Sequence, residues 1–330
     1  MHIDLATLRG LEREQEIPFE ELAEIIEQAI HSAYLKHAVE RGFTTPPEDV
    51  RVELNRKTGD IDIMLTERDE DDAIIGESPV KTDDFGRIAA SAAKMVINQR
   101  LRELADDAVL GEFKGKEGDI LSGVVQQGPN PRMVNVDLGV VEGIIPPEEQ
   151  VPGESYAHGT RIRVYVTSVA KGPKGPQVVL SRTHPGLVRR LFALEVPEIA
   201  SGVVEIVSLA REAGHRSKVA VRSHDASINA KGTCIGEMGR RVRAVMAELG
   251  EEKIDIIDYS PDLPKFVANA LSPAKVTEAF VIDQSLKQVR ALVPDFQLSL
   301  AIGKEGQNAR LAAKLTGAKI DIQPDSVMDS

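Results

Sequence analysis

The first patterned segment of the chain has apolar residues at helical spacing after Pro18. These residues are Leu22, Ile26, Ala29, Ile30 and Ala33. Because proline suits a first helical turn and glutamates flank the apolar face, we predict an acidic amphipathic helix. Alternating apolar positions at 50–54 and 61–65, around a turn at 57–60, predict a hairpin. A long helix is predicted through Ile88, Met95 and Leu104, with Asp83 or Asp84 as its cap.

From Lys116 onward the pattern changes to short strands separated by glycine and proline. The predicted strands are 120–125, 134–138, 143–145, 161–169 and 178–180. Five short strands within about 65 residues favour a small barrel such as an OB-fold. The segment resembles an S1-type domain, with GDILSG opening it at 118–123 and VLSR ending it at 179–182.

The last part of the chain contains an internal repeat of 67 residues. The segment 234–243 corresponds to 301–310, and each copy closes on a Lys-Ile-Asp-Ile strand, at 253–256 and at 319–322. Two strand-like segments precede each copy, at 203–209 with 218–222 and at 276–282 with 288–293. The order helix-strand-strand-helix-helix-strand, found twice, resembles the type II KH domain, whose Gly-x-x-Gly loop clamps a nucleic-acid backbone.

These patterns predict an α+β multidomain protein. Its expected parts are an N-terminal α/β domain at 1–112, an S1-type OB β-barrel at 116–183, and two tandem type II KH domains at 184–259 and 260–330. The link 256–264 is short and holds two prolines, so we expect it to be stiff and to fix the relation of the two KH domains.

Glycines suit a loop that presses its backbone against phosphates, because no Cβ intervenes. The following helix N-terminus offers free N–H groups and a positive dipole end, and nearby cations add charge. A single such loop is as easily a glycine hinge, but two copies in register favour RNA binding. The RNA-binding candidates are Lys218, Lys231, Ile235, Gly236, Glu237, Met238, Gly239, Arg240, Arg241, Arg243, Ile302, Gly303, Lys304, Glu305, Gly306, Gln307, Asn308 and Arg310.

Charge is unevenly distributed along the chain. The net charge is −12, and residues 1–115, with 14 Lys+Arg against 26 Asp+Glu, account for all of it. The segment 211–243 holds eight basic and three acidic residues. This asymmetry indicates different partners for the two parts.

Other chemistry is sparse. Cys234 is the single cysteine, which excludes an intramolecular disulfide framework and suits a reducing cytosol. We favour a buried, inert role for it over an activated thiol. The first residues lack the apolar run of a signal peptide, and no apolar stretch approaches the ~20 residues of a membrane helix. A cytoplasmic protein with no membrane partner is therefore expected.

The seven histidines are scattered, and no Walker loop or nucleophile elbow is present. We therefore predict no metal site, no cofactor and no enzymatic activity. The acidic run 69–72 could collect Mg²⁺, but a solvated loop is the better interpretation. The barrel has only Tyr156 and Tyr165 as aromatics, with Gln126, Gln127 and Pro129 near its expected binding strands. A spacer role is therefore as plausible for it as RNA binding.

The order of these domains resembles that of the NusA family of bacterial transcription factors. The most specific matches are GTCIG at 232–236, EKIDII at 252–257 and NALSPA at 269–274. The resemblance implies a monomer that binds RNA polymerase through its N-terminal domain, near the RNA exit. It also implies binding of emerging single-stranded RNA, contacts with other transcription factors, and modulation of pausing, termination and antitermination. Some members continue into acidic repeats, and functions of those repeats are not expected here.

Two rival functions use similar modules. Phosphorolytic ribonucleases carry KH and S1-type domains, but in the opposite order and behind a catalytic core larger than the first ~110 residues here. A ribosome-associated or translational RNA-binding protein shares the modules and remains the alternative.

Overall fold

A computed structural model describes residues 2–15, 17–43, 46–69, 73–80, 85–172 and 175–326. The chain divides into two compact units, Met1–Ala108 and Val109–Ser330. Within the described ranges, no helix has both the length and the apolar character that crossing a membrane requires. The predicted cap at Asp83 or Asp84, and most of the acidic run 69–72, lie outside these ranges.

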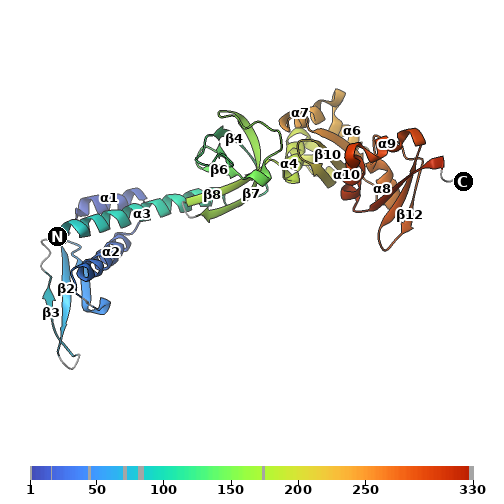
Figure 1. The fold of residues 1–330 in the computed structure, drawn as a ribbon. Helices are drawn as coiled ribbons and strands as arrows, with labels where there is room; N and C mark the ends of the chain where they lie inside the picture. The colour runs from blue at the N-terminus through green and yellow to red at the C-terminus, as the bar shows by residue number, and fades with distance from the viewer. Residues whose placement is uncertain are drawn as a thin grey trace. The chain divides into compact units, whose positions relative to one another are not determined.

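The first unit packs helices against a three-stranded sheet (Figure 1). Its elements are α1 (Leu5–Gln15), α2 (Phe19–Glu40), β1 (Val50–Leu54), β2 (Ile61–Arg68), β3 (Ile74–Pro79) and the start of α3 (Gly86–Phe113). The predicted face of α2 is buried at Leu22, Ile26 and Ile30. The predicted hairpin is the antiparallel β1–β2 pair. Sequence patterning missed β3, because its two adjacent isoleucines, 74 and 75, are both exposed and give no alternation.

The second unit begins with a closed five-stranded barrel, which confirms the OB-like prediction. Its strands are β4 (Ile120–Gln126), β5 (Val134–Asp137), β6 (Glu142–Ile145), β7 (Arg161–Gly172) and β8 (Gly175–Ser181), in the order β4-β5-β6-β8-β7. Phe113, at the end of α3, joins the apolar core of this barrel.

Two domains of the same topology follow the barrel, as the repeat predicts (Figure 1). The first contains α4 (Pro185–Glu195), α5 (Pro197–Ala200), β9 (Val204–Glu212), β10 (Arg216–Ser223), α6 (Ala230–Ile235), α7 (Arg240–Glu248) and β11 (Lys253–Asp258). The second contains α8 (Leu263–Ala270), β12 (Glu278–Asp283), β13 (Gln288–Val293), α9 (Leu298–Ile302), α10 (Gln307–Thr316) and β14 (Lys319–Pro324). In each sheet the middle strand pairs antiparallel with the first strand and parallel with the last.

The two KH domains share an apolar core. Ala220 and Ile257 of the first domain are buried in one cluster with Phe266, Val267 and Leu311 of the second. Side chains on the open face of the first sheet pack on α8 and α10, so this core ties the two domains together in addition to the link 256–264. The two domains therefore form one body.

Candidate nucleic-acid interface

The two glycine loops have the same backbone conformation, and each joins a short helix to a longer one. The matched residues are Gly236 and Gly303 (φ 73° and 79°), Met238 and Glu305 (50° and 54°), and Gly239 and Gly306 (74° and 73°). In each loop the N–H of the second glycine donates to the carbonyl of the first, at 3.0 and 3.1 Å. A Cβ on Gly303 would lie 2.7 Å from the Asn308 nitrogen, so this turn requires glycine.

A helix N-terminus follows each loop. α7 and α10 both begin after a left-handed glycine, and no side chain caps either of them. The first N–H groups of a helix have no partner within the helix, and the dipole makes that end partly positive. Each loop therefore presents uncapped N–H groups to an anion such as an RNA phosphate.

Most of the predicted loop residues are accessible. Glu237, Met238, Arg240 and Arg243 are exposed at the first loop, with Met238 at 85%. Ile302, Lys304, Glu305 and Arg310 are exposed at the second, while Ile235 and Gln307 are half-buried.

Two predicted RNA-binding side chains are instead buried, which contradicts the exposure expected of them. Lys218 is fully buried on β10, where its Nζ donates to Asp255 Oδ2 at 3.0 Å and to the Ser272 carbonyl at 2.7 Å. Burial lowers the pKa of Lys218. Asn308 is 2% exposed, and its Nδ2 donates to the Leu271 and Ala301 carbonyls, both at 2.9 Å. Lys218 thus ties the first KH domain to the second, whereas Asn308 holds α10 to α8 and α9 within the second domain. Neither side chain is exposed as an RNA-binding residue must be.

Internal ion pairs neutralise much of the basic segment 211–243. Arg241 Nη1 donates to Glu198 at 3.0 Å and to the Thr233 carbonyl at 2.9 Å. Lys231 lies 3.9 Å from Asp258. The arginines at 211, 216 and 222 also pair with carboxylates. Of the eight basic residues, Arg240 and Arg243 alone have no ion pair within the described residues. The attraction of the first loop for phosphate is thus concentrated at the start of α7.

The second loop has a partner in the first KH domain. Arg310 Nε donates to Glu212 Oε1 at 2.6 Å, and Gln307 Nε2 donates to Glu212 Oε2 at 2.9 Å. The Arg310 hydrogen bond lowers the pKa of Glu212. This contact crosses from β9 to α10 and leaves Lys304 as the exposed, unpaired cation of the second loop within the described residues.

Cys234 lies in the core of the first KH domain, fully buried behind its glycine loop. Burial raises the pKa of this thiol to about 11. The alternative of an activated thiol is therefore wrong.

We expect Cys234 in the folded protein to react with iodoacetamide at pH 8 roughly 100-fold or more slowly than in urea. The reason is that the thiolate is scarce at that pH and the sulfur is covered. Mass spectrometry of quenched samples measures the rate. Rapid alkylation in native buffer would contradict the buried placement.

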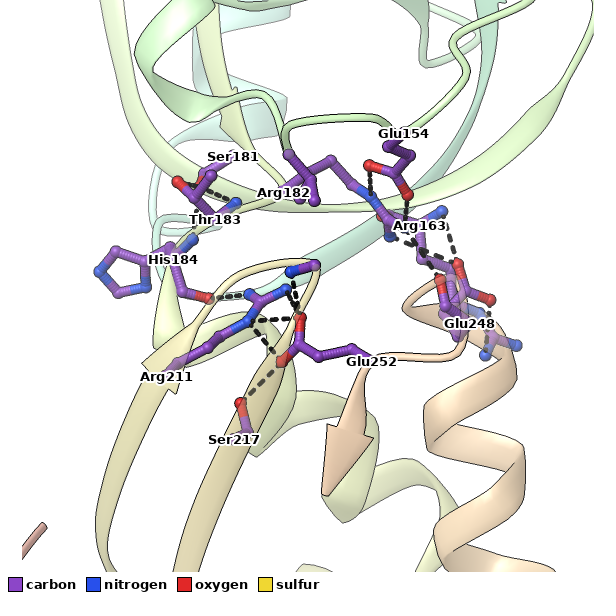
Figure 2. Close-up of polar contacts among 12 residues, drawn as sticks. Glu154, Arg163, Ser181, Arg182, Thr183, His184, Arg211, Ser217, Glu248 and Glu252 are labelled. Carbon is purple, nitrogen blue, oxygen red and sulfur yellow. Dashed lines mark hydrogen bonds and ion pairs between the residues drawn. The ribbon is translucent and has the colours of Figure 1, made fainter. Parts of the chain in front are cut away.

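Polar contacts join the barrel to the first KH domain (Figure 2). Arg182 is 2% exposed and pairs with Glu154 of the barrel, while its guanidinium also donates to the Arg163 carbonyl at 2.8 Å and to the Glu248 carbonyl at 2.9 Å. Arg211 donates to the His184 carbonyl at 3.0 Å and pairs with Glu252. Sequence reasoning placed 182 only at a strand end, because nothing local reveals its distant partners.

The two barrel tyrosines make contacts with other side chains of the protein. Tyr165 stacks on His184 with ring centroids 4.3 Å apart, and the Tyr156 hydroxyl donates to Glu154. Burial, with this hydrogen bond, raises the pKa of Tyr156. Rings held in this way are poor platforms for bases, which favours the spacer role. Among the described residues, no three His, Cys, Asp or Glu side chains gather as a metal site would require.

Comparisons with known proteins match three parts of the chain to domain models and nearly its full length to relatives. A NusA N-terminal domain model matches residues 5–68, a NusA-like first KH domain matches 182–259, and a NusA-like second KH domain matches 263–329. The transcription termination/antitermination protein NusA of Mycobacterium bovis is 54% identical over 333 residues, covering 99% of this chain and 94% of that protein. The Bacillus subtilis protein of that name is 46% identical over 98% of this chain and 91% of its own length. The Thermus thermophilus protein is 39% identical over 98% and 90%.

Proposed function

The chain belongs to the NusA family of transcription termination/antitermination proteins, and from this premise we propose that it binds RNA polymerase through its N-terminal unit and nascent single-stranded RNA through its KH pair. Through these contacts in the cytoplasm it modulates pausing, termination and antitermination. The observation that carries the RNA half of this proposal is the pair of glycine loops, built twice with the same dihedral angles on one body.

The KH pair supports a single extended RNA site. Each KH loop clamps about four nucleotides of backbone, and bases lie in an aliphatic groove such as that beside Ile235 or Ile302. Because the shared core fixes the two loops, filling one raises the effective concentration of RNA at the other. Unpaired RNA on the order of ten nucleotides should therefore bind more tightly than RNA of five. The same sequence folded in a hairpin should not bind, because its bases are not free.

The N-terminal unit is suited to a protein partner. Residues 1–115 carry a net charge of −12, which repels phosphate. The NusA N-terminal domain model matches within this segment, and the segment has its own apolar core. These observations support a polymerase contact rather than an RNA contact.

We expect a fragment of residues 1–112 to bind RNA polymerase and not to bind RNA, because it keeps the apolar core of the N-terminal unit and the acidic charge. The remainder of the chain should bind RNA and have little affinity for RNA polymerase. Co-purification from lysate and fluorescence anisotropy with unpaired RNA measure the two activities. RNA binding by the fragment would contradict this division, and co-purification of the full chain with ribosomes instead of polymerase would favour the translational alternative.

A further inference from the structure

The sheet of the N-terminal unit has a free edge at β1. The strand order is β1-β2-β3, so β1 pairs with a strand on one side only. Backbone groups of successive residues in a strand point to opposite edges. The Asn55 N–H donates to the Asp60 carbonyl at 2.8 Å, on the side of β2. The N–H and carbonyl groups of Leu54 and Val52 alternate with this one and therefore point away from β2.

At one end of this edge, a side chain takes the place of a neighbouring strand. The Leu54 N–H donates to Glu27 Oε1 of α2 at 2.7 Å, where the carbonyl of a further strand would otherwise lie. Val52, two residues earlier, is half-buried and has no hydrogen bond on that side within the described residues. The edge is therefore closed at Leu54 and open at Val52. Unpaired groups of this kind are a template for pairing with another chain.

A cavity of about 480 Å³ lies beside the open part of the edge, between α2 and β1. Its lining includes Glu24, Glu27 and Gln28 of α2 and Val50 and Val52 of β1. We call it the edge groove. Because α2 packs on the face of the sheet that carries the side chains of Val50 and Val52, a strand added at β1 would present alternate side chains to α2.

The charge of the groove favours a basic occupant. Glu24 is exposed and has no ion pair within the described residues. Arg51 is the only lysine or arginine among the described residues of the lining, and Glu77 of β3 neutralises it at 2.7 Å. Residues 1–115 add a net charge of −12 around the groove. A lysine or arginine on the α2-facing side of an added strand would therefore meet an unpaired carboxylate.

We propose that the edge groove binds an extended, basic segment of a protein partner, which joins the sheet as a further strand beside β1 and places a lysine or arginine against Glu24. Main-chain pairing with Val52 supplies affinity, and the carboxylate selects the side chain. The same carboxylate repels phosphate, so RNA is not the occupant. This site goes beyond the proposed polymerase contact, and its test uses neither polymerase nor RNA.

The test uses a fluorescein-labelled peptide of about six residues, the length of a typical strand, in which threonine and arginine alternate. Full-length protein is titrated into this peptide, and fluorescence anisotropy measures binding. A second peptide carries glutamate in place of arginine and should bind roughly tenfold more weakly or worse, because like charges then meet in the groove. The site is refuted if the arginine peptide does not bind, or if both peptides bind equally.

Two methylated forms of the arginine peptide test the strand pairing. One is N-methylated at its threonines and the other at its arginines, so each loses the N–H donors of one edge only. Since a single edge of the peptide faces β1, one form should bind like the parent and the other roughly tenfold more weakly or worse. Equal affinity of the two forms would rule out pairing with β1.

Glu24→Lys tests the charge from the side of the protein. It should weaken binding of the arginine peptide roughly tenfold at low salt, because an attraction is replaced by a repulsion. Glu40→Lys is the matched control, since Glu40 is exposed at the end of the same helix, outside the groove. It lies about 24 Å from Glu24 along the helix, beyond the Debye length, and should change affinity by less than about twofold. Equal losses in the two variants would leave the groove no part in binding.

Hydrogen exchange of the full-length protein locates the peptide. The bound peptide should slow exchange in the segment of β1, 50–54, where the Val52 N–H gains an acceptor. The segment of β2, 61–68, should exchange as before, because β2 is already paired on both sides. Protection confined to segments other than 50–54 would overturn the proposed site.

Discussion

Replacing Glu237 and Met238 by two aspartates should weaken binding of unpaired RNA at least tenfold. Both side chains are exposed at the tip of the first loop, where the backbone is placed to meet phosphate. An added negative charge within about 4 Å of a phosphate costs roughly 1–4 kcal/mol, and 1.4 kcal/mol is tenfold in affinity. Aspartate tolerates the positive φ at 238 better than most residues, so the fold should persist. Anisotropy titration with RNA of about 12 nucleotides measures the loss.

The second loop gives an independent copy of this test. Lys304→Asp with Glu305→Asp removes the unpaired cation of that loop and changes the net charge by −2, against −1 for the first double variant. Gln284→Asp and Leu286→Asp are the controls, since both side chains are exposed on the β12–β13 turn of the same domain. Leu286→Asp alone changes the net charge by −1 and is the control for the first-loop variant. Gln284→Asp with Leu286→Asp changes it by −2 and is the control for the second-loop variant. If both loop variants bind RNA as tightly as their controls, the loops are not the RNA interface.

The sequence was sufficient where the pattern is local. Strand alternation and paired glycines predicted the barrel, both KH topologies and both loops, because each depends on a few neighbouring residues. The relatives and domain matches confirm the resemblance to the NusA family.

The prediction failed where burial depends on distant partners. Lys218 was placed on the RNA surface by its charge, yet β10 is covered on both faces, by its own helices and by the second KH domain. One signal was present in the run KVAV at 218–221. Successive residues of a strand point to opposite faces of the sheet, and every residue of this run except the lysine is apolar, as in a strand buried on both faces. Asn308 gave no such signal, because its carbonyl partners, including Leu271, are set by packing against α8 and α9.

Glu252→Ala should destabilise the first KH domain by about 3–5 kcal/mol. The Glu252 carboxylate is fully buried and accepts hydrogen bonds from Arg211, the Gly214 nitrogen and the Ser217 hydroxyl (Figure 2). Its removal leaves the Arg211 guanidinium, which is 3% exposed, without a counter-charge. Arg211 also holds the His184 carbonyl at the start of the domain, so the loss should reach the link from the barrel.

Alkylation of Cys234 measures this loss of stability, because the thiol lies in the core of the same domain. Opening of the domain exposes the thiol, so a loss of about 3 kcal/mol should raise its alkylation rate on the order of 100-fold in native buffer. Glu205→Ala is the matched control, since the Glu205–Arg222 pair also holds β9 in the sheet of this domain, by joining it to β10, but its side chains are 41% and 44% exposed. An exposed pair contributes at most about 1 kcal/mol, so the alkylation rate should rise no more than about fivefold. Equal rates in the two variants would show that the buried pair at Glu252 stabilises the domain no more than a surface pair does.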